Sequence, residues 1–132
     1  MKYLLDTNIC IYLIKRKPLD VIDEFRSHGV GEIGVSSITV SELWYGVAKS
    51  EHRKANERAL EQFLLPLMIS PFDDQAAEAY GTIRAALEKE GQPIGAMDLL
   101  IAAHAVSMGL ILVTNNEREF SRVPELIVEN WA

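Results

Sequence analysis

Residues 97–116 read MDLLIAAHAVSMGLILVTNN, and this stretch indicates the class of fold. The segment 97–108 predicts a very apolar helix with a single charged residue, Asp98, near its start, and Gly109 is a typical residue to end it. The apolar run 110–113 follows at once and predicts a strand that ends in a polar turn. A helix followed directly by a short, wholly apolar strand is typical of a parallel sheet covered by helices on both faces.

The same alternation of strands and helices runs through the rest of the chain. The apolar pattern predicts strands at 2–5, 33–35, 67–69, 110–113 and 126–128, helices at 8–16, 18–26, 39–49, 53–65, 74–90, 97–108 and 117–120, and a break at 28–31. We therefore predict one domain over residues 1–132, a three-layer α/β/α sandwich with a central, mostly parallel sheet.

Composition excludes several classes of protein. With 132 residues, of which 48% are hydrophobic, the chain can bury a core without disulfides. One cysteine, Cys10, provides neither a disulfide framework nor a cysteine zinc site, and the chain is expected in a reducing, cytoplasmic compartment with no membrane span. A net charge of −6 disfavours a protein that coats DNA through many phosphate contacts.

Acidic and polar residues stand where predicted strands end and predicted helices begin. Asp6 directly follows the first strand, and Asn116 belongs to the turn after the fourth. Glu42 is expected in the first turn of the helix after the second strand, and Asp98 in the first turn of the apolar helix. Strand carboxyl ends and helix N-termini share one edge of a parallel α/β sheet, where ligands bind. We therefore expect these four side chains to converge.

Such a group of side chains predicts a metal-dependent hydrolase. Carboxylates gathered at one point repel each other unless a proton or a cation neutralises them. Oxygen ligands without histidine or cysteine favour Mg²⁺, for which Mn²⁺ can substitute. We expect Asp6 and Asp98 to hold the metal, Glu42 and Asn116 to complete the catalytic set, and the reaction to be hydrolysis of a phosphodiester.

Each of these residues also has a purely structural interpretation. Asp6 suits an N-cap of the following helix, and Thr39 and Glu42 have the spacing of a capping box. Asp98 could simply favour the positive end of its helix, and Asn116 could belong to an ordinary turn. The conjunction of all four residues is a stronger indication of chemistry than any one of them.

Four segments carry a resemblance to a known family. They are LLDTN (4–8), SSITVSELWYG (36–46), PIGAMDLLIAAHA (93–105) and LVTNNEREF (112–120). In this order they resemble the PIN-domain ribonucleases, and more closely the VapC toxins of bacterial toxin–antitoxin systems. The resemblance covers essentially the whole chain, and its C-terminal part is similar to the group that cuts initiator tRNA.

The resemblance implies a site that binds Mg²⁺ or Mn²⁺ at the end of a parallel sheet. The family's acidic residues match Asp6, Glu42 and Asp98, and its polar positions match Thr7 and Thr114. A fourth acidic position of many members falls on Asn116, which leaves open whether one or two ions are used. Glu119 lies near this turn and is either a substitute for the missing acid or a surface residue.

The function implied is the toxin of a type II toxin–antitoxin system. Such a protein is a metal-dependent endoribonuclease, here expected to cut initiator tRNA at the anticodon stem-loop. The resemblance further implies a homodimer, inhibition by a VapB antitoxin, and operator DNA bound only through that antitoxin. The basic residues available for RNA are Lys15, Arg16, Lys17, Lys49, Arg53, Lys54, Arg58, Arg118 and Arg122.

Three alternatives remain beside this reading. The first is a PIN-domain nuclease that acts on other RNA in RNA processing. A phospho-signalling receiver domain needs an aspartate directly after its third strand, but Ser70-Pro71-Phe72 follows the strand at 67–69. A binding-only domain with a degenerate site is disfavoured because Asp6, Glu42 and Asp98 are all present.

Overall fold

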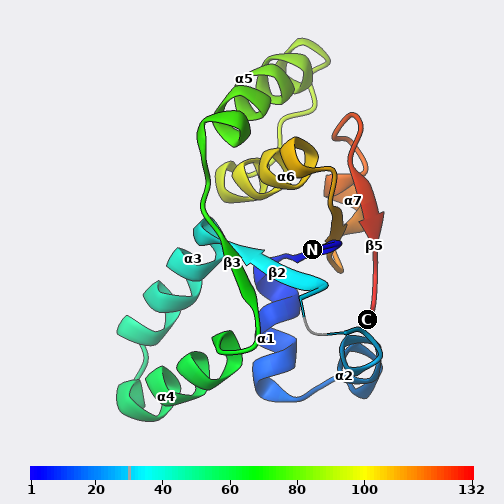
Figure 1. Ribbon diagram of the computed structural model, residues 1–132. Coiled ribbons are helices and arrows are strands. Elements are labelled where there is room, and N and C mark those ends of the chain that lie inside the picture. The colour runs from blue at the N-terminus through cyan, green and yellow to red at the C-terminus, as the bar shows by residue number, and fades with distance from the viewer. Residues whose placement is uncertain (30) are drawn as a thin grey trace.

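A computed structural model describes residues 1–29 and 31–132 of the protein, so Val30, in the predicted break, lies outside the described residues. Five parallel strands form one sheet in the order β3-β2-β1-β4-β5 (Figure 1). The strands are β1 (Tyr3–Leu5), β2 (Ile33–Ser36), β3 (Met68–Ser70), β4 (Ile111–Val113) and β5 (Ile127–Glu129). The predicted α/β class is confirmed, and the strands that the structure describes are all parallel.

Helices cover both faces of the sheet (Figure 1). One face packs against α1 (Thr7–Lys15), α2 (Leu19–Arg26), α3 (Ser37–Ala48) and α4 (Arg53–Leu64). The other face packs against α5 (Asp74–Lys89), α6 (Ala96–Met108) and α7 (Glu117–Phe120). No helix within the described residues is long and apolar enough to cross a lipid bilayer.

The two strands at the middle of the candidate site, β1 and β4, are apolar at every position because they fill two cores at once. Successive side chains of a strand point to opposite faces of the sheet. In β1, Tyr3 and Leu5 join the core under α1–α4, while Leu4 joins the core under α5–α7. The edge strand β3 differs from this expectation, since Met68 and Ile69 are about half exposed. A short apolar run therefore predicted the strand correctly but not its place at the edge.

Helix α3 begins earlier than its sequence predicts. Its N-cap is Ser36, whose hydroxyl oxygen accepts a hydrogen bond from the backbone N–H of Ile38 at 3.1 Å. The predicted capping box is wrong, because Thr39 lies buried inside the helix. Glu42 consequently stands in the second turn of α3 and not in the first. Gly109 does end α6, in the left-handed conformation with φ 64°.

The order of the strands reverses at β1, which places the candidate site. From β1 the chain passes to β2 on one side, and it returns after β3 to β4 on the other side. The carboxyl ends of β1 and β4 are therefore neighbours, and the backbone N–H of Asp6 donates to the carbonyl of Val113 at 3.0 Å. Ligands of open α/β sheets bind beyond such a reversal.

Candidate active site

Asp6 stands at the reversal and is almost completely buried, with 4% of its surface exposed. Its Oδ1 accepts a hydrogen bond from the backbone N–H of Ile9 at 2.9 Å, so Asp6 is the N-cap of α1 as one interpretation predicted. Its Oδ2 accepts a hydrogen bond from the hydroxyl of Thr114, which follows β4. These two contacts, from α1 and from the end of β4, fix the orientation of the Asp6 carboxylate. Its role as a helix cap does not exclude a second role.

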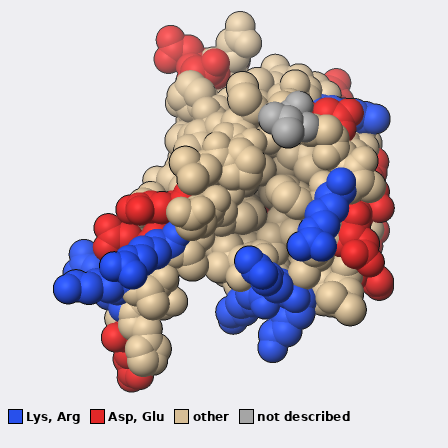
Figure 2. All heavy atoms as spheres, turned by 60° about the horizontal axis from the view of Figure 1, so that its bottom comes forward, with Lys and Arg blue, Asp and Glu red and all other residues tan. Residues whose placement is uncertain are grey.

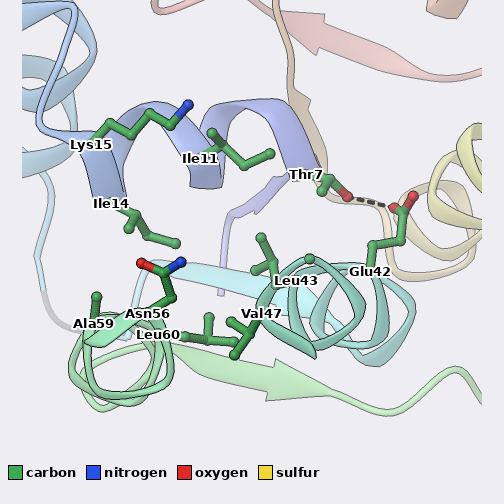
Figure 3. Close-up of a pocket in the computed structure, with 11 residues that line it drawn as sticks. Thr7, Ile11, Ile14, Lys15, Glu42, Leu43, Val47, Asn56, Ala59 and Leu60 are labelled. Atoms are coloured by element: carbon green, nitrogen blue, oxygen red, sulfur yellow. Dashed lines mark hydrogen bonds between the residues drawn. The ribbon is translucent and has the colours of Figure 1, made fainter. Parts of the chain in front are cut away.

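Glu42 reaches the same edge from α3. The hydroxyl of Thr7, the first residue of α1, donates to Oε1 of Glu42 at 2.6 Å (Figure 3). This contact joins two residues that lie 35 positions apart in the sequence. Thr7 thus fixes the Glu42 carboxylate, and no local pattern of the sequence could have predicted that pairing.

Asp98 lies in the first turn of α6 and forms a pair with Glu119 of α7. The two carboxyl groups hydrogen-bond to each other, which requires a proton on one of them. The backbone N–H of Gly95, the N-cap of α6, donates to Oε1 of Glu119 at 3.0 Å. Glu119 therefore belongs to the cluster, and its proximity to the polar turn in sequence was the signal that pointed to it.

Asn116 connects the two halves of the cluster. Its backbone N–H donates to Oγ1 of Thr114 at 2.9 Å, and Thr114 in turn donates to Asp6. Its side-chain amide donates to Oε2 of Glu119 at 3.1 Å. Asn116 therefore contacts the cluster by holding Glu119, and its predicted place in the catalytic set stays a prediction.

The electrostatics of the cluster oppose its full ionisation. Burial raises the pKa of Asp98 to about 7, with further contributions from its hydrogen bond to Glu119 and from repulsion by Glu119, Asp6 and Glu42. Burial also raises the pKa of Asp6, against the hydrogen bonds from Thr114 and Ile9. Partial burial would raise the pKa of Glu119, but the hydrogen bonds from Gly95, Asp98 and Asn116 outweigh it and lower that pKa. In this pair Asp98 holds the proton.

The donor set fits a hard divalent cation. Asp6, Glu42, Asp98 and Glu119 provide carboxylate oxygens, and a cation would relieve the repulsion that adds to burial in raising the pKa of Asp98. Within residues 1–29 and 31–132, no three Asp, Glu, His or Cys side chains are arranged closely enough to hold an ion by themselves. Mg²⁺ usually binds through only one or two carboxylates and keeps several waters, so it does not require three protein ligands at one point.

Comparison with known proteins gives one consistent family. The family model described as PIN domain matches residues 3–126. The chain is 51% identical to ribonuclease VapC2 of Haemophilus influenzae, over 99% of this chain and 98% of that one. It is 45% identical to the tRNA(fMet)-specific endonuclease VapC of Shigella flexneri, over 100% and 99% of the two chains. The crystal structure of DNA-bound VapBC from Salmonella typhimurium superposes with a TM-score of 0.95 at 43% identity, covering 100% of this chain and 99% of that one. The chain belongs to the PIN domain family, and within it to the VapC group.

Proposed function

We propose that the protein is the toxin of a type II toxin–antitoxin system and acts as a Mg²⁺-dependent endoribonuclease. The observation that carries this proposal is the convergence of Asp6, Glu42 and Asp98, from three separate elements, at the reversal of strand order. Burial raises the pKa of Asp98, repulsion by the neighbouring carboxylates adds to this shift, and a cation bound at the site would offset the repulsion. Mn²⁺ has the same ligand preference and is expected to substitute.

The names of the relatives support RNA as the substrate. One is a ribonuclease, and another, from Shigella flexneri, is specific for tRNA(fMet). Both match this chain over nearly its full length. We infer that initiator tRNA is the target and that the cut lies in the anticodon stem-loop, since proteins read RNA sequence mainly at loop bases that are free of pairing.

Different side chains of the cluster have different roles in the proposed hydrolysis. Asp6 and Asp98 would hold the cation, which when bound supplies positive charge to the scissile phosphate and makes water more acidic. Glu42, fixed at Oε1 by Thr7, is placed to take the proton of the attacking water at its other oxygen. Water attacks phosphorus as its proton passes to Glu42, the bond to the leaving oxygen breaks, and that oxygen takes up a proton from solvent.

Two groups of exposed basic residues offer contacts for the phosphates of RNA. One group, Lys15, Arg16 and Lys17, closes α1, and the other, Lys49, Arg53, Lys54 and Arg58, lies at the end of α3 and on α4. Figure 2 shows blue side chains gathered in separate groups on this face, with acidic side chains beside them. A few phosphate contacts of this kind suit an acidic protein that recognises the shape of a folded RNA.

We propose that a groove beside Glu42 is the binding site for the antitoxin. It has a volume of about 320 Å³ and runs between α1, α3 and α4, from Thr7 and Glu42 at one end to Lys15 and Asn56 at the other (Figure 3). Its apolar lining is Ile11, Ile14, Leu43, Val47, Ala59 and Leu60. An apolar segment with a basic residue at the Glu42 end would fill the groove and place positive charge in the acidic site. DNA recognition is then left to the antitoxin, as the net charge of −6 favours.

The substitution Gly46→Leu is expected to weaken antitoxin binding at least about tenfold. Gly46 lines the groove, and a Cβ atom there meets nothing within 4 Å, so a leucine side chain would project into the space of the partner. Leucine is also a better helix former than glycine, so the fold is retained. The matched control is Gly81→Leu on α5, where a Cβ atom also meets open space. Equal affinity of both variants in a titration calorimeter would place the partner elsewhere.

The substitution Asn116→Asp is expected to raise the affinity for Mn²⁺. The change replaces an amide that donates to Glu119 with a fifth carboxylate at the cluster, and a cation gains from each added negative charge. Calorimetric titration of the protein with Mn²⁺ measures the effect. Asn115→Asp is the matched control, because it adds the same charge to an exposed neighbour whose side chain donates to the Tyr12 hydroxyl. An equal gain in both variants would mean that Asn116 acts only through net charge.

The proposed function is tested by incubating the purified protein with total tRNA and mapping the cut ends. We expect cleavage of initiator tRNA in its anticodon stem-loop when Mg²⁺ is present, and none in EDTA. Cleavage that persists in EDTA would overturn the metal-dependent mechanism. Cleavage of many RNAs without preference for initiator tRNA would favour the alternative, a PIN-domain nuclease of RNA processing.

A further inference from the structure

A buried histidine outside the acidic cluster joins the helix that carries Glu42 to the helix that carries Asp98. His104 lies on α6 with 1% of its surface exposed. Its Nδ1 is 2.8 Å from Oγ of Ser36, and its Nε2 is 3.1 Å from Oγ of Ser70. Ser36 ends β2 and is the N-cap of α3, and Ser70 ends β3. One imidazole ring thus ties α6 to the ends of two strands and to the start of α3.

The neighbouring contacts favour one direction for these hydrogen bonds. The hydroxyl of Ser70 donates to Sδ of Met108 at 3.3 Å, and because a hydroxyl has one proton, Ser70 accepts from Nε2–H of His104. A neutral ring then has a bare Nδ1, which accepts from the hydroxyl of Ser36. Ser36 keeps a lone pair for the backbone N–H of Ile38, its bond as the helix cap. One neutral tautomer therefore satisfies every member of this chain.

A charged ring does not fit the same chain. An imidazolium has an N–H at both nitrogens, so the proton of Ser36 would lose its acceptor. Burial lowers the pKa of His104, although the negative charge of Asp73 acts in the opposite direction. The ring of Phe72 meets His104 edge-on at 5.6 Å and adds an apolar neighbour. These surroundings favour the neutral imidazole that the hydrogen bonds require.

We propose that His104 is a positioning residue for the nuclease site: through Ser36 it fixes the start of α3, and with it Glu42, relative to Asp98. This inference rests on the proposed function. Ser36 stands six residues before Glu42, and His104 stands six residues after Asp98. In each case about 9 Å of helix separates the hydrogen-bonding residue from the site residue. A tilt of α3 by about 6° would then move Glu42 by about 1 Å, and a displacement of that size can cost about a hundredfold in rate.

Two substitutions of His104 separate this role from general stability. In His104→Asn the side-chain oxygen can take the place of Nδ1 and still accept from Ser36, whereas the contact with Ser70 is lost. In His104→Gln the amide reaches the place of Nε2 and can still donate to Ser70, whereas the contact with Ser36 is lost. We expect His104→Asn to keep kcat within about threefold, and His104→Gln to lose about tenfold or more in kcat with KM unchanged.

The control variant is Ser70→Ala, which removes the contact that the proposal does not use. We expect it to lower the unfolding temperature while kcat stays within about threefold of wild type. If kcat of the variants at His104 and Ser70 simply follows their unfolding temperatures, the positioning role is overturned. A wild-type protein that fails to cleave RNA would instead overturn the proposed function, and the positioning role with it.

A measurement on the wild-type protein needs neither cleavage nor a variant that folds well. Imidazole ¹⁵N chemical shifts distinguish the two neutral tautomers and the charged form of each of the three histidines. We expect a neutral, Nε2-protonated ring for His104 at pH 7, assigned by loss of its signals in His104→Asn. A charged or Nδ1-protonated ring would contradict the direction of the hydrogen-bond chain and overturn the proposal.

Discussion

Asp98→Asn protein is expected to lose RNA cleavage by about a thousandfold or more while it remains folded. Asp98 is one of the two residues proposed to hold the cation, and the cation supplies several kcal/mol of stabilisation to the charge that develops on phosphate. Asparagine keeps the size of the side chain and can still donate to Glu119, so the pair of side chains remains hydrogen-bonded. The loss is measured as kcat/KM on initiator tRNA with saturating Mg²⁺.

The same variant is expected to change how the metal-free protein responds to pH. Folding raises the pKa of Asp98 from 3.8 to about 7, so the folded protein binds a proton more tightly than the unfolded chain. The stability that this proton provides is complete below pH 3.8 and is lost as the pH rises through about 7. Asp98→Asn has no such group, so wild type should lose stability relative to the variant across this interval in EDTA. Urea unfolding at several pH values measures it.

Asp74→Asn is the matched control for Asp98→Asn. Asp74 is an exposed acid in the first turn of α5, so the change removes the same charge from an equivalent place on another helix. We expect it to leave cleavage unchanged, and its urea unfolding is measured over the same pH interval. Full cleavage by Asp98→Asn would exclude Asp98 as a ligand, and an identical pH profile for both variants would mean that Asp98 is not specially protonated.

The edge of the sheet that holds the site was predictable because a parallel sheet imposes it. Short, wholly apolar runs predicted strands that fill two cores, and the carboxyl ends of such strands must share an edge. Asp6 and Thr114 follow two of these runs directly, and the structure joins them by a hydrogen bond. The convergence of residues 108 positions apart thus required only the period of the apolar pattern and one rule of topology.

The details that were not predictable depend on contacts between distant residues. The segment SSITVSE (36–42) offers several residues that can cap a helix, and local spacing favours Thr39 with Glu42. The structure uses Ser36, which also bonds to His104, 68 positions away. Local spacing does not encode contacts of that range. Because the helix begins after Ser36 and not after Thr39, Glu42 lies in its second turn and not in its first. The hydrogen bond from Thr7 to Glu42 likewise depends on the folded chain and has no local signal in the sequence.

For Asn116 the sequence predicts the location of the residue but not the orientation of its side chain. The turn after a strand predicted that Asn116 lies at this edge of the sheet, and its backbone N–H does donate to Thr114. The orientation of its side chain depends on Glu119, which is placed by α7 and by the N–H of Gly95. The sequence could therefore suggest Glu119 as a substitute acid but could not decide that Asn116 holds it.

Asp6→Ala is expected to cost both cleavage and stability, whereas Asp6→Asn is expected to cost cleavage with little change in stability. Alanine removes the N-cap of α1, which contributes about 1 kcal/mol, and leaves the buried hydroxyl of Thr114 without its acceptor, which costs about 1 kcal/mol more. Asparagine keeps an oxygen for the backbone N–H of Ile9, and its NH₂ group can donate to Oγ1 of Thr114 once that hydroxyl rotates, but it removes the charge that a cation needs. Both variants should therefore fall about a thousandfold in cleavage.

Asp73 provides the matched pair of control variants, because it caps α5 with the same geometry and lies outside the cluster. Its Oδ1 accepts from the backbone N–H of Ala76 at 3.0 Å, as Oδ1 of Asp6 accepts from Ile9. Asp73→Ala should lose about 1 kcal/mol of unfolding free energy and no cleavage, and Asp73→Asn should lose little of either. Cleavage that survives in Asp6→Asn would reduce Asp6 to a helix cap. If instead both Asp6 variants are inactive, and only the alanine variant is destabilised, one carboxylate both caps the first helix and holds the ion, because both roles need oxygen at the same strand end.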